Sequence, residues 1–150
     1  QYMAYSGKFN PKNIEKYRGD PTQIYYRSRW ELKFLSMLDN NQDVIQYSSE
    51  EFCIPYVNPF DNKYHRYFPD FWVKNKNGDN MVIEIKPWKQ TIEPKKPNIK
   101  RLSESKVYVN NMTRYIINKK KWEAAQLYCK KRGDKWKFII LTENELGIKF

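Results

Sequence analysis

Apolar residues recur at helical spacing directly after Ser28. In the stretch "SRWE", Ser28 and Glu31 stand at the two positions of a capping box, where each side chain accepts a backbone N–H bond at the start of a helix. The apolar face that follows consists of Trp30, Phe34, Met37 and Leu38. The pattern predicts a helix over residues 29–39, ended by the sequence "DNN".

Short segments rich in β-branched and aromatic residues come next, separated by polar or proline-containing turns. They cover residues 44–50, 52–56 and 64–73 and predict strands. The stretch "MVIEIKP" alternates most regularly. Its two faces consist of Met81, Ile83 and Ile85 on one side and Val82, Glu84 and Lys86 on the other. This period of two predicts a strand with one face in the core.

The C-terminal third begins with a loop that carries Pro87, Pro94 and Pro97, enough to break a helix or a central strand. Residues 98–111 have the spacing of a moderately amphipathic helix, although "VYV" also suits a strand. Asn118 is the predicted N-cap of a further helix, for which Gly133 supplies the stop.

The last segments complete the order of elements. Residues 135–141, "KWKFIIL", predict a buried strand, and "TENE", residues 142–145, is a second capping box that opens a short final helix. The order of helices and strands predicts an α+β or α/β fold around one mixed sheet.

Residues 4–27 mix Gly, Pro, Lys and Tyr without a sustained period. We expect them to form an arm that lies over the domain rather than a helix. Gln1 and Tyr2 precede Met3 and are treated as additions to the native chain. Since 150 residues are about one ordinary domain, the expected organisation is an arm over residues 1–27 and one domain over residues 28–150.

The chain is strongly basic, with 28 Lys and Arg against 17 Asp and Glu and a formal charge of +11. Such a charge is typical of proteins that bind the phosphate backbone of nucleic acids. Aromatic residues make up 17% of the chain and are interleaved with the basic ones, and aromatic rings can stack on bases. Many of these rings must also belong to the core.

Cysteine usage and hydropathy exclude several classes. Cys53 and Cys129 lie far apart and His65 is the only histidine, so neither a structural zinc site nor a disulfide scaffold is expected. No run of about 18 apolar residues occurs, and the N-terminus lacks the apolar core of a signal peptide. We expect a protein of the reducing cytoplasm that neither crosses a membrane nor is exported by that route.

Asp70, Glu84 and Lys86 lie within or beside predicted core strands. A two-residue loop at Asn77-Gly78 would place Glu84 opposite Phe71 and turn Asp70 to the other face. A three-residue loop over residues 76–78, with Gly78 left-handed and a bulge beside it, would place Asp70 opposite Glu84. Both loops suit the sequence, and only the second brings the two carboxylates to one face.

Two adjacent carboxylates repel each other, and a cation between them would offset this repulsion. Mg²⁺ is the natural candidate because it takes oxygen ligands and accepts phosphate oxygens as well, and Mn²⁺ is its expected substitute. Lys86 would hold or help to deprotonate an attacking water and offset charge on the scissile phosphate. Two acids and a base on one face of a basic protein indicate phosphodiester hydrolysis. The alternative for Glu84 and Lys86 alone is an exposed strand with a polar face.

Pro69-Asp70, followed after 13 residues by Glu84-Ile85-Lys86, resembles the motif of the PD-(D/E)xK nuclease superfamily. This resemblance implies an α/β, restriction-endonuclease-like fold with a mixed central sheet flanked by helices. It also implies that Glu31, on the first helix, joins Asp70 and Glu84 as a metal ligand in catalysis. The alternative is that Glu31 only completes the capping box with Ser28.

Over nearly its whole length the chain resembles the head completion nucleases of contractile-tailed phages. The similar stretches are "MAYSGKFNPKNIEKYRGDP", "YRSRWE", "RYFPDFWV", "IEIKP", "KWEAAQ" and "LTENEL". A more distant similarity is to the endonuclease subunit of heteromeric transposases. The resemblance implies a nuclease that acts on double-stranded phage DNA when filled heads accept tails, in the host cytoplasm or on the virion, with phage head or portal proteins as partners.

Further basic residues flank the carboxylates in sequence. They are Arg27, Arg29, His65, Arg66 and Lys89, and we expect them to hold phosphates on either side of the cut; ordinary surface positions are the alternative. Residues 119–121, three lysines, would open the helix after Asn118, where positive charge opposes the helix dipole. The three lysines would then either bind phosphate or simply lie on a face of the helix that is exposed to solvent.

Three functions remain open from the sequence. The first is a metal-dependent DNA endonuclease. The second is a structural DNA-binding protein of head-to-tail joining with an inactive nuclease fold, and the third is a homing or junction-specific endonuclease. One active site cuts one strand, so cleavage of both strands requires a homodimer or two sequential events.

Overall fold

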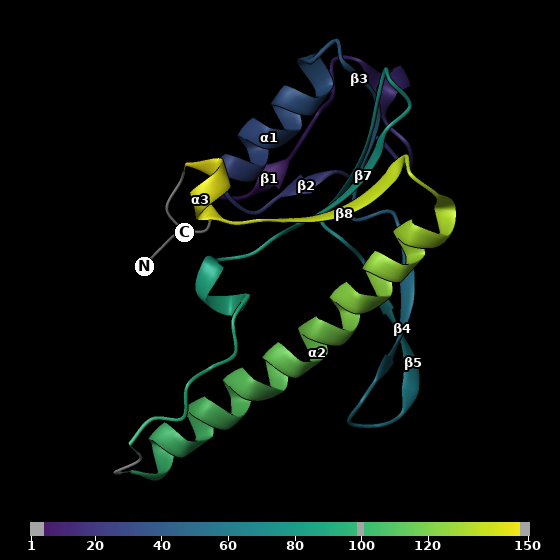
Figure 1. Cartoon of the computed structure of the whole chain (residues 1–150). Helices are drawn as coiled ribbons and strands as arrows, with labels where there is room; N and C mark the ends of the chain where they lie inside the picture. The colour runs from purple at the N-terminus through teal and green to yellow at the C-terminus, as the bar shows by residue number, and fades with distance from the viewer. Residues whose placement is uncertain (1–4, 99–100, 148–150) are drawn as a thin grey trace.

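The computed structural model describes residues 5–98 and 101–147. A four-stranded mixed sheet forms its centre (Figure 1). Its strands, in spatial order, are β3 (Val44–Ser49), β6 (Phe71–Asn75), β7 (Asn80–Ile85) and β8 (Trp136–Leu141). β6 is antiparallel to both of its neighbours, whereas β7 and β8 are parallel. The predicted α/β fold with a mixed central sheet is confirmed.

Two helices cover opposite faces of this sheet. α1 (Arg29–Asn40) buries Leu35 and Leu38 in a cluster that includes Phe71 and Ile83 from the sheet. α2 (Leu102–Arg132) packs Trp122 and Ala125 into a second cluster with Val82. The alternation predicted for the β7 stretch is therefore confirmed, because odd-numbered and even-numbered residues of the strand belong to different cores. The prediction of only one face in the core is wrong, because α2 covers the second face, on which Val82 and Glu84 are buried.

The turn between β6 and β7 has the three-residue loop. Phe71 pairs with Ile83 and Lys74 with Asn80, while Gly78 has a φ of 86° in the left-handed region that favours glycine. Extended by one residue, this register places Asp70 opposite Glu84. The three-residue loop, which is required for Asp70 and Glu84 to share one face, is confirmed.

The start of α1 differs from the predicted capping box. Ser28 is the N-cap and its Oγ accepts a hydrogen bond from the backbone N–H of Glu31 at 3.2 Å. The Glu31 side chain, however, accepts from the backbone N–H of Arg27 at 2.9 Å instead of that of Ser28. Only the serine half of the box is confirmed, and the glutamate reaches one residue further back.

The predicted helix start at Asn118 is wrong. α2 is one helix of 31 residues in which Asn118 is an interior, buried position, and its N-cap is Arg101. Residues 98–132 contain neither Gly nor Pro, and an interior Asn costs a helix only several tenths of a kcal/mol, about 0.7 at most. Residues 119–121 consequently lie in mid-helix, so their charges do not oppose a helix N-terminus. The predicted stop at Gly133 is confirmed.

The segment predicted as one strand over residues 64–73 is divided between two sheets. β4 (Ile54–Asn58) and β5 (Lys63–Tyr67) form a separate antiparallel hairpin, and residues 68–70 carry the chain from that hairpin into β6. Pro69, which has no backbone N–H, stands at this break. Figure 1 shows the hairpin and the first half of α2 extending beyond the central sheet.

The N-terminal residues pack onto the α1 side without a long helix, as predicted. They contain β1 (Gly7–Lys8), the 3₁₀ turn η1 (Ile14–Lys16) and β2 (Tyr25–Tyr26). β1 pairs with β2, and Phe9, Tyr17 and Ile24 are buried in the same cluster as Leu35. Gln1 and Tyr2 lie outside the described residues.

Two short elements complete the chain. The 3₁₀ turn η2 (Trp88–Gln90) follows β7, and α3 (Glu143–Leu146) follows β8. Thr142 and Glu145 form the predicted capping box at the start of α3, which is confirmed. Within residues 5–98 and 101–147, every helix is too short or too polar to cross a lipid bilayer.

Candidate active site

Asp70 stands where the chain enters β6. Its Oδ2 accepts a hydrogen bond of 2.7 Å from the backbone N–H of Ile85 on β7, which holds the carboxylate across the end of the neighbouring strand. Burial, followed by the negative charge of Glu84, raises the pKa of Asp70 to about 7. The surroundings of Asp70 therefore favour the uncharged form of its carboxyl group.

Glu84 is buried, with only 6% of its surface exposed. Its Oε1 accepts a hydrogen bond of 2.7 Å from the Tyr67 hydroxyl, and its Oε2 lies 3.6 Å from Lys86 Nζ. Burial raises the pKa of Glu84, against the opposing effects of the Tyr67 hydrogen bond and the nearby Lys86 charge. Tyr67 comes from β5, so the hairpin that leads to Asp70 also holds Glu84.

Lys86 directly follows β7. Its backbone N–H donates to the Leu141 carbonyl at 3.0 Å, which fixes the chain beside the end of β8. The side chain is 27% exposed and points its ammonium group toward Glu84. Asp70, Glu84 and Lys86, predicted to share one site, are brought together at the ends of β6 and β7.

Glu31 reaches the same region from α1. Together with Asp70 and Glu50 it lines a small pocket of about 80 Å³ between α1 and the ends of β3 and β6. Burial raises the pKa of Glu31, although its hydrogen bond from the Arg27 backbone opposes this effect. The predicted fourth carboxylate thus shares a cavity with Asp70 while also stabilising the start of α1.

Glu50 is a site residue that the sequence analysis missed. It follows β3 with a φ of 54°, and its backbone N–H donates to the Asp70 carbonyl at 3.1 Å. Its carboxylate forms an ion pair of 2.7 Å with Arg27, and its charge contributes to the raised pKa of Asp70. No local motif marks this residue, because only the pairing of β3 with β6 brings it to Asp70.

Lys121 was also missed as a neighbour of the site. Its ammonium group lies 5.8 Å from the ring centres of both Tyr56 and Tyr67, and its charge opposes the upward shift of the Glu84 pKa. Burial lowers the pKa of Lys121. The mistaken helix start hid this role, because a lysine in mid-helix over the sheet can face the carboxylates.

The five basic residues predicted to hold DNA do not form one cluster. Arg27 borders the carboxylates through its ion pair with Glu50, and the Arg29 guanidinium lies 5.0 Å from the Tyr5 ring centre. His65 pairs with Asp61 at 2.7 Å on the β4–β5 hairpin.

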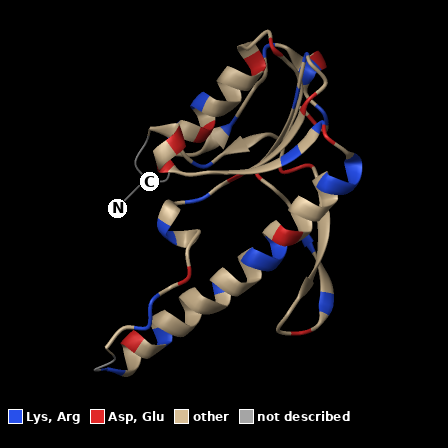
Figure 2. Ribbon diagram, in the orientation of Figure 1, with Lys and Arg blue, Asp and Glu red and all other residues tan. Residues whose placement is uncertain are grey.

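Arg66 and Lys89 occupy two further places. The Arg66 guanidinium lies 5.7 Å from the Phe68 ring centre, and Lys89 in η2 borders a groove beside α2. Figure 2 shows basic residues along α2, on the hairpin and beside the central sheet. The positive charge is therefore distributed around the site.

The site offers oxygen donors of the kind that hard divalent cations prefer. Among the described residues, no group of three or more His, Cys, Asp and Glu side chains has the geometry of a metal site. The bond from Ile85 uses one oxygen of Asp70 and the bond from Tyr67 uses one oxygen of Glu84, while the second oxygen of Glu84 faces the Lys86 ammonium group at 3.6 Å. A cation in this site would offset the two charges that burial disfavours, and Mg²⁺ is commonly bound by one or two carboxylates completed by waters and phosphate oxygens.

Comparisons with known proteins connect this geometry to nucleases. The model of the TnsA-like endonuclease N-terminal family matches residues 41–143, a range that contains Asp70, Glu84 and Lys86 but not Glu31. The head completion nuclease of Enterobacteria phage T4 is 47% identical over 144 residues, which are 96% of this chain and 95% of that protein. No solved structure matches the chain. The resemblances stated from the sequence are confirmed.

Proposed function

Because the chain belongs to the TnsA-like endonucleases and is therefore a nuclease, we propose that it is a Mg²⁺-dependent DNA endonuclease with Asp70, Glu84, Lys86 and Glu31 as its catalytic residues. The observation that carries this proposal is the pairing of β6 with β7, which sets Asp70 beside Glu84. Two buried carboxylates with raised pKa values, next to a lysine, are arranged for chemistry rather than for stability.

Asp70, Glu84 and Glu31 would hold the metal, with Mn²⁺ as a substitute. Bound Mg²⁺ supplies a positive charge that polarises the scissile phosphate and steadies the leaving oxygen. Tyr67 keeps Glu84 oriented through its hydrogen bond, and the Ile85 backbone does the same for Asp70. Both carboxylates are therefore fixed before a substrate arrives, which lowers the cost of reorganisation during the reaction.

Lys86 acts on the attacking water. Its ammonium group is oriented by Glu84 at 3.6 Å and remains partly exposed, so it can donate to a water or to a non-bridging phosphate oxygen on the solvent side. Positioning the water beside the phosphate raises its effective concentration, and the lysine charge offsets the charge that develops on the phosphate.

Arg27, Arg29, His65, Arg66 and Lys89 would hold backbone phosphates around the cut. Their distribution over the arm, the hairpin and η2 suits an extended substrate such as DNA, which presents phosphates at regular intervals. Arg27 would exchange its ion pair with Glu50 for a phosphate. The exchange is easy because both side chains of this pair are substantially exposed.

The T4 relative is named a head completion nuclease. By this similarity, the chain would act on phage DNA during head completion and head-to-tail joining, in the host cytoplasm or on the virion. Phage head or portal proteins would be its partners, and a homodimer would allow it to cut both strands.

Incubation of the purified protein with plasmid DNA in Mg²⁺, Mn²⁺ or EDTA tests the proposal. We expect cleavage with either metal and none in EDTA. Absence of cleavage with every metal, on linear, nicked and branched DNA alike, would contradict the proposal and favour a structural DNA-binding role. Cleavage confined to branched DNA would instead support a junction-specific endonuclease.

A further inference from the structure

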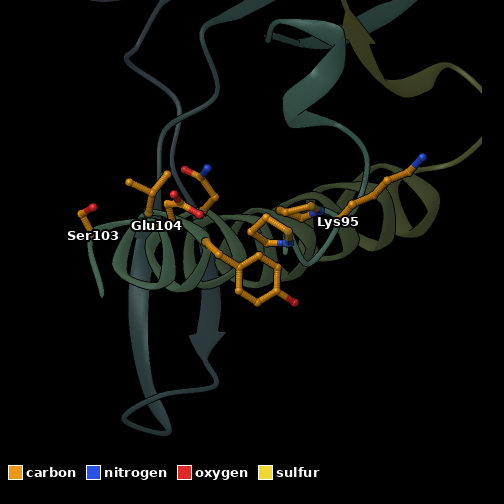
Figure 3. Close-up of a pocket in the computed structure, with 8 residues that line it drawn as sticks. Lys95, Ser103 and Glu104 are labelled. Atoms are coloured by element: carbon orange, nitrogen blue, oxygen red, sulfur yellow. The ribbon is translucent and has the colours of Figure 1, made fainter. Parts of the chain in front are cut away.

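A groove runs along α2 beside the segment that follows η2. One half has a volume of about 440 Å³ and begins at Lys89, and the other has a volume of about 460 Å³ and ends near the start of α2. Pro94, Lys95 and Asn111 line both halves, so the two are continuous. Figure 3 shows the second half, with Lys95 at one end and Ser103 and Glu104 at the other.

The half that begins at Lys89 is suited to an anion. Lys89, Lys95 and Arg114 line it, together with the polar side chains of Asn111 and Tyr115. None of its described lining residues is acidic. Three positive charges from two separate chain segments therefore face one cavity, and no carboxylate within its lining offsets them.

Asn118 adds an independent sign of a ligand. This residue is only 6% exposed and lines the same half of the groove. No hydrogen bond joins its amide to any other residue within 5–98 and 101–147. In the described part of the chain, Trp122 Nε1 is the only fully buried side-chain polar atom without a partner, so the Asn118 amide is open to the groove and available to a ligand. A phosphate or sugar oxygen in the groove would provide the missing partner.

The second half of the groove has a different character. Val107, Tyr108, Pro94 and Pro97 supply apolar and aromatic lining, and its acidic residue Glu104 is paired with Arg101 at 3.2 Å. An aromatic ring beside apolar side chains suits a nucleobase or a deoxyribose. Each half is within the range of about 300–1,000 Å³ that accommodates a small organic ligand, comparable with one nucleotide.

We infer that this groove binds a single DNA strand that leaves the active site along α2. Lys89 lies three residues after Lys86, so the groove begins where the proposed catalytic strand ends. Phosphates would contact Lys89, Arg114 and Asn118, and a base would lie near Tyr108. Because each half has a volume of only about 440–460 Å³, the groove suits one strand, and the preferred substrate is DNA with an unpaired end.

This inference rests on the proposed nuclease function, but its test does not require cleavage. Fluorescence anisotropy in EDTA measures binding of a labelled short oligothymidine and of a blunt duplex of equal length. Arg114→Gln removes a groove charge, and Asn118→Leu removes the unpartnered amide at similar volume. Lys131→Gln is the matched control because Lys131 is exposed on the same helix, about 25 Å further along its axis.

We expect the single strand to bind more tightly than the duplex. Arg114→Gln should weaken single-strand binding about fivefold and reduce the slope of log affinity against log salt by about 0.7. Asn118→Leu should weaken single-strand binding but leave the salt slope and the melting temperature unchanged. Lys131→Gln should change neither the affinity nor the salt slope. Inorganic phosphate should compete only at concentrations far above that of the oligonucleotide.

Equal effects of Arg114→Gln and Lys131→Gln would overturn the inference, because they would indicate binding by overall charge. Duplex binding as tight as that of the single strand would overturn the assignment of one strand. Failure of the nuclease proposal has a different result: Arg114-dependent strand binding would persist although plasmid DNA stays uncut with every metal.

Discussion

Asp70 Oδ2 accepts a hydrogen bond of 2.7 Å from the backbone N–H of Ile85, the residue that follows Glu84 on the neighbouring strand. This bond ties the carboxylate to the end of β7 and keeps it beside a second buried carboxylate. Two such groups destabilise the folded chain when both are charged. Their placement is accounted for if a cation and a phosphate complete the site.

The stability of the metal-free protein should fall as pH rises toward neutrality. The folded-state pKa of Asp70 is raised to about 7, above the value of about 3.9 expected in the unfolded chain. The folded state therefore binds more protons between these two values, and its stability is greatest below the lower one and decreases through the upper one. Melting temperatures in EDTA should drop from about pH 5 to about pH 8.

Asp70→Asn should flatten this dependence, since the amide does not ionise. The matched control is Asp43→Asn, because Asp43 is exposed and paired with Lys76 at 2.8 Å. We expect Asp43→Asn to keep the full pH dependence of the melting temperature and Asp70→Asn to lose most of it. Identical profiles of the two variants would refute the assignment to Asp70.

Glu31→Gln should separate the two roles of this residue. Glutamine retains an oxygen that can accept the Arg27 backbone N–H, so the free energy of unfolding should change by less than about 0.5 kcal/mol. The lost negative charge should reduce cleavage about 100-fold. Chemical denaturation and plasmid cleavage measure the two effects. Wild-type cleavage by the variant would show that Glu31 only stabilises the helix start.

Tyr67→Phe should remove the hydrogen bond that orients the Glu84 carboxylate. The hydroxyl donates to a buried carboxylate at 2.7 Å, and loss of a hydrogen bond to a charged group costs about 1.5–3 kcal/mol. The pKa of Glu84 should rise further, because this bond lowers it, so the pH profile of cleavage should move to higher pH. Tyr64→Phe, at a residue 79% exposed on the same hairpin, should leave both stability and profile unchanged. An unchanged pH profile of cleavage in Tyr67→Phe would contradict the proposed effect of this hydrogen bond on the pKa of Glu84.

Glu50→Gln should strengthen DNA binding about two- to fivefold. The substitution removes the carboxylate that pairs with Arg27 at 2.7 Å, and the exposed pair is worth less than about 1 kcal/mol. Arg27 would then be available to a phosphate without losing a partner. Anisotropy with duplex DNA in EDTA measures the effect, and Glu123→Gln, an exposed position on α2, serves as control. Weaker binding by Glu50→Gln would mean that the ion pair positions Arg27 for DNA.

Local patterns predicted those parts of the fold that depend on near neighbours in sequence. The N-cap Ser28, the stop at Gly133 and the box at Thr142 each act within one turn of a helix. Gly78 made the three-residue loop possible, and the loop set the register that brings Asp70 to Glu84. The core of the candidate site was therefore accessible from the sequence because a single hairpin carries it.

Contacts between distant segments could not be predicted in this way. Asn118 is a good N-cap by residue type, yet packing of Trp122 and Ala125 against the sheet carries the helix through it. Glu50 reaches Asp70 through the pairing of β3 with β6, and Lys121 reaches Glu84 through the docking of α2. No motif encodes these approaches, because each depends on how separate elements pack.

Plasmid cleavage by Asp70→Asn, compared with the wild type and with Asp43→Asn in Mg²⁺, tests the central claim most directly. Asparagine preserves the size of the side chain and an oxygen for the Ile85 backbone N–H, so the fold should be retained. We predict a loss of cleavage of about 1,000-fold for Asp70→Asn and wild-type cleavage for Asp43→Asn. Cleavage by a folded Asp70→Asn protein at the wild-type rate would contradict the account, because the active site would then lie elsewhere.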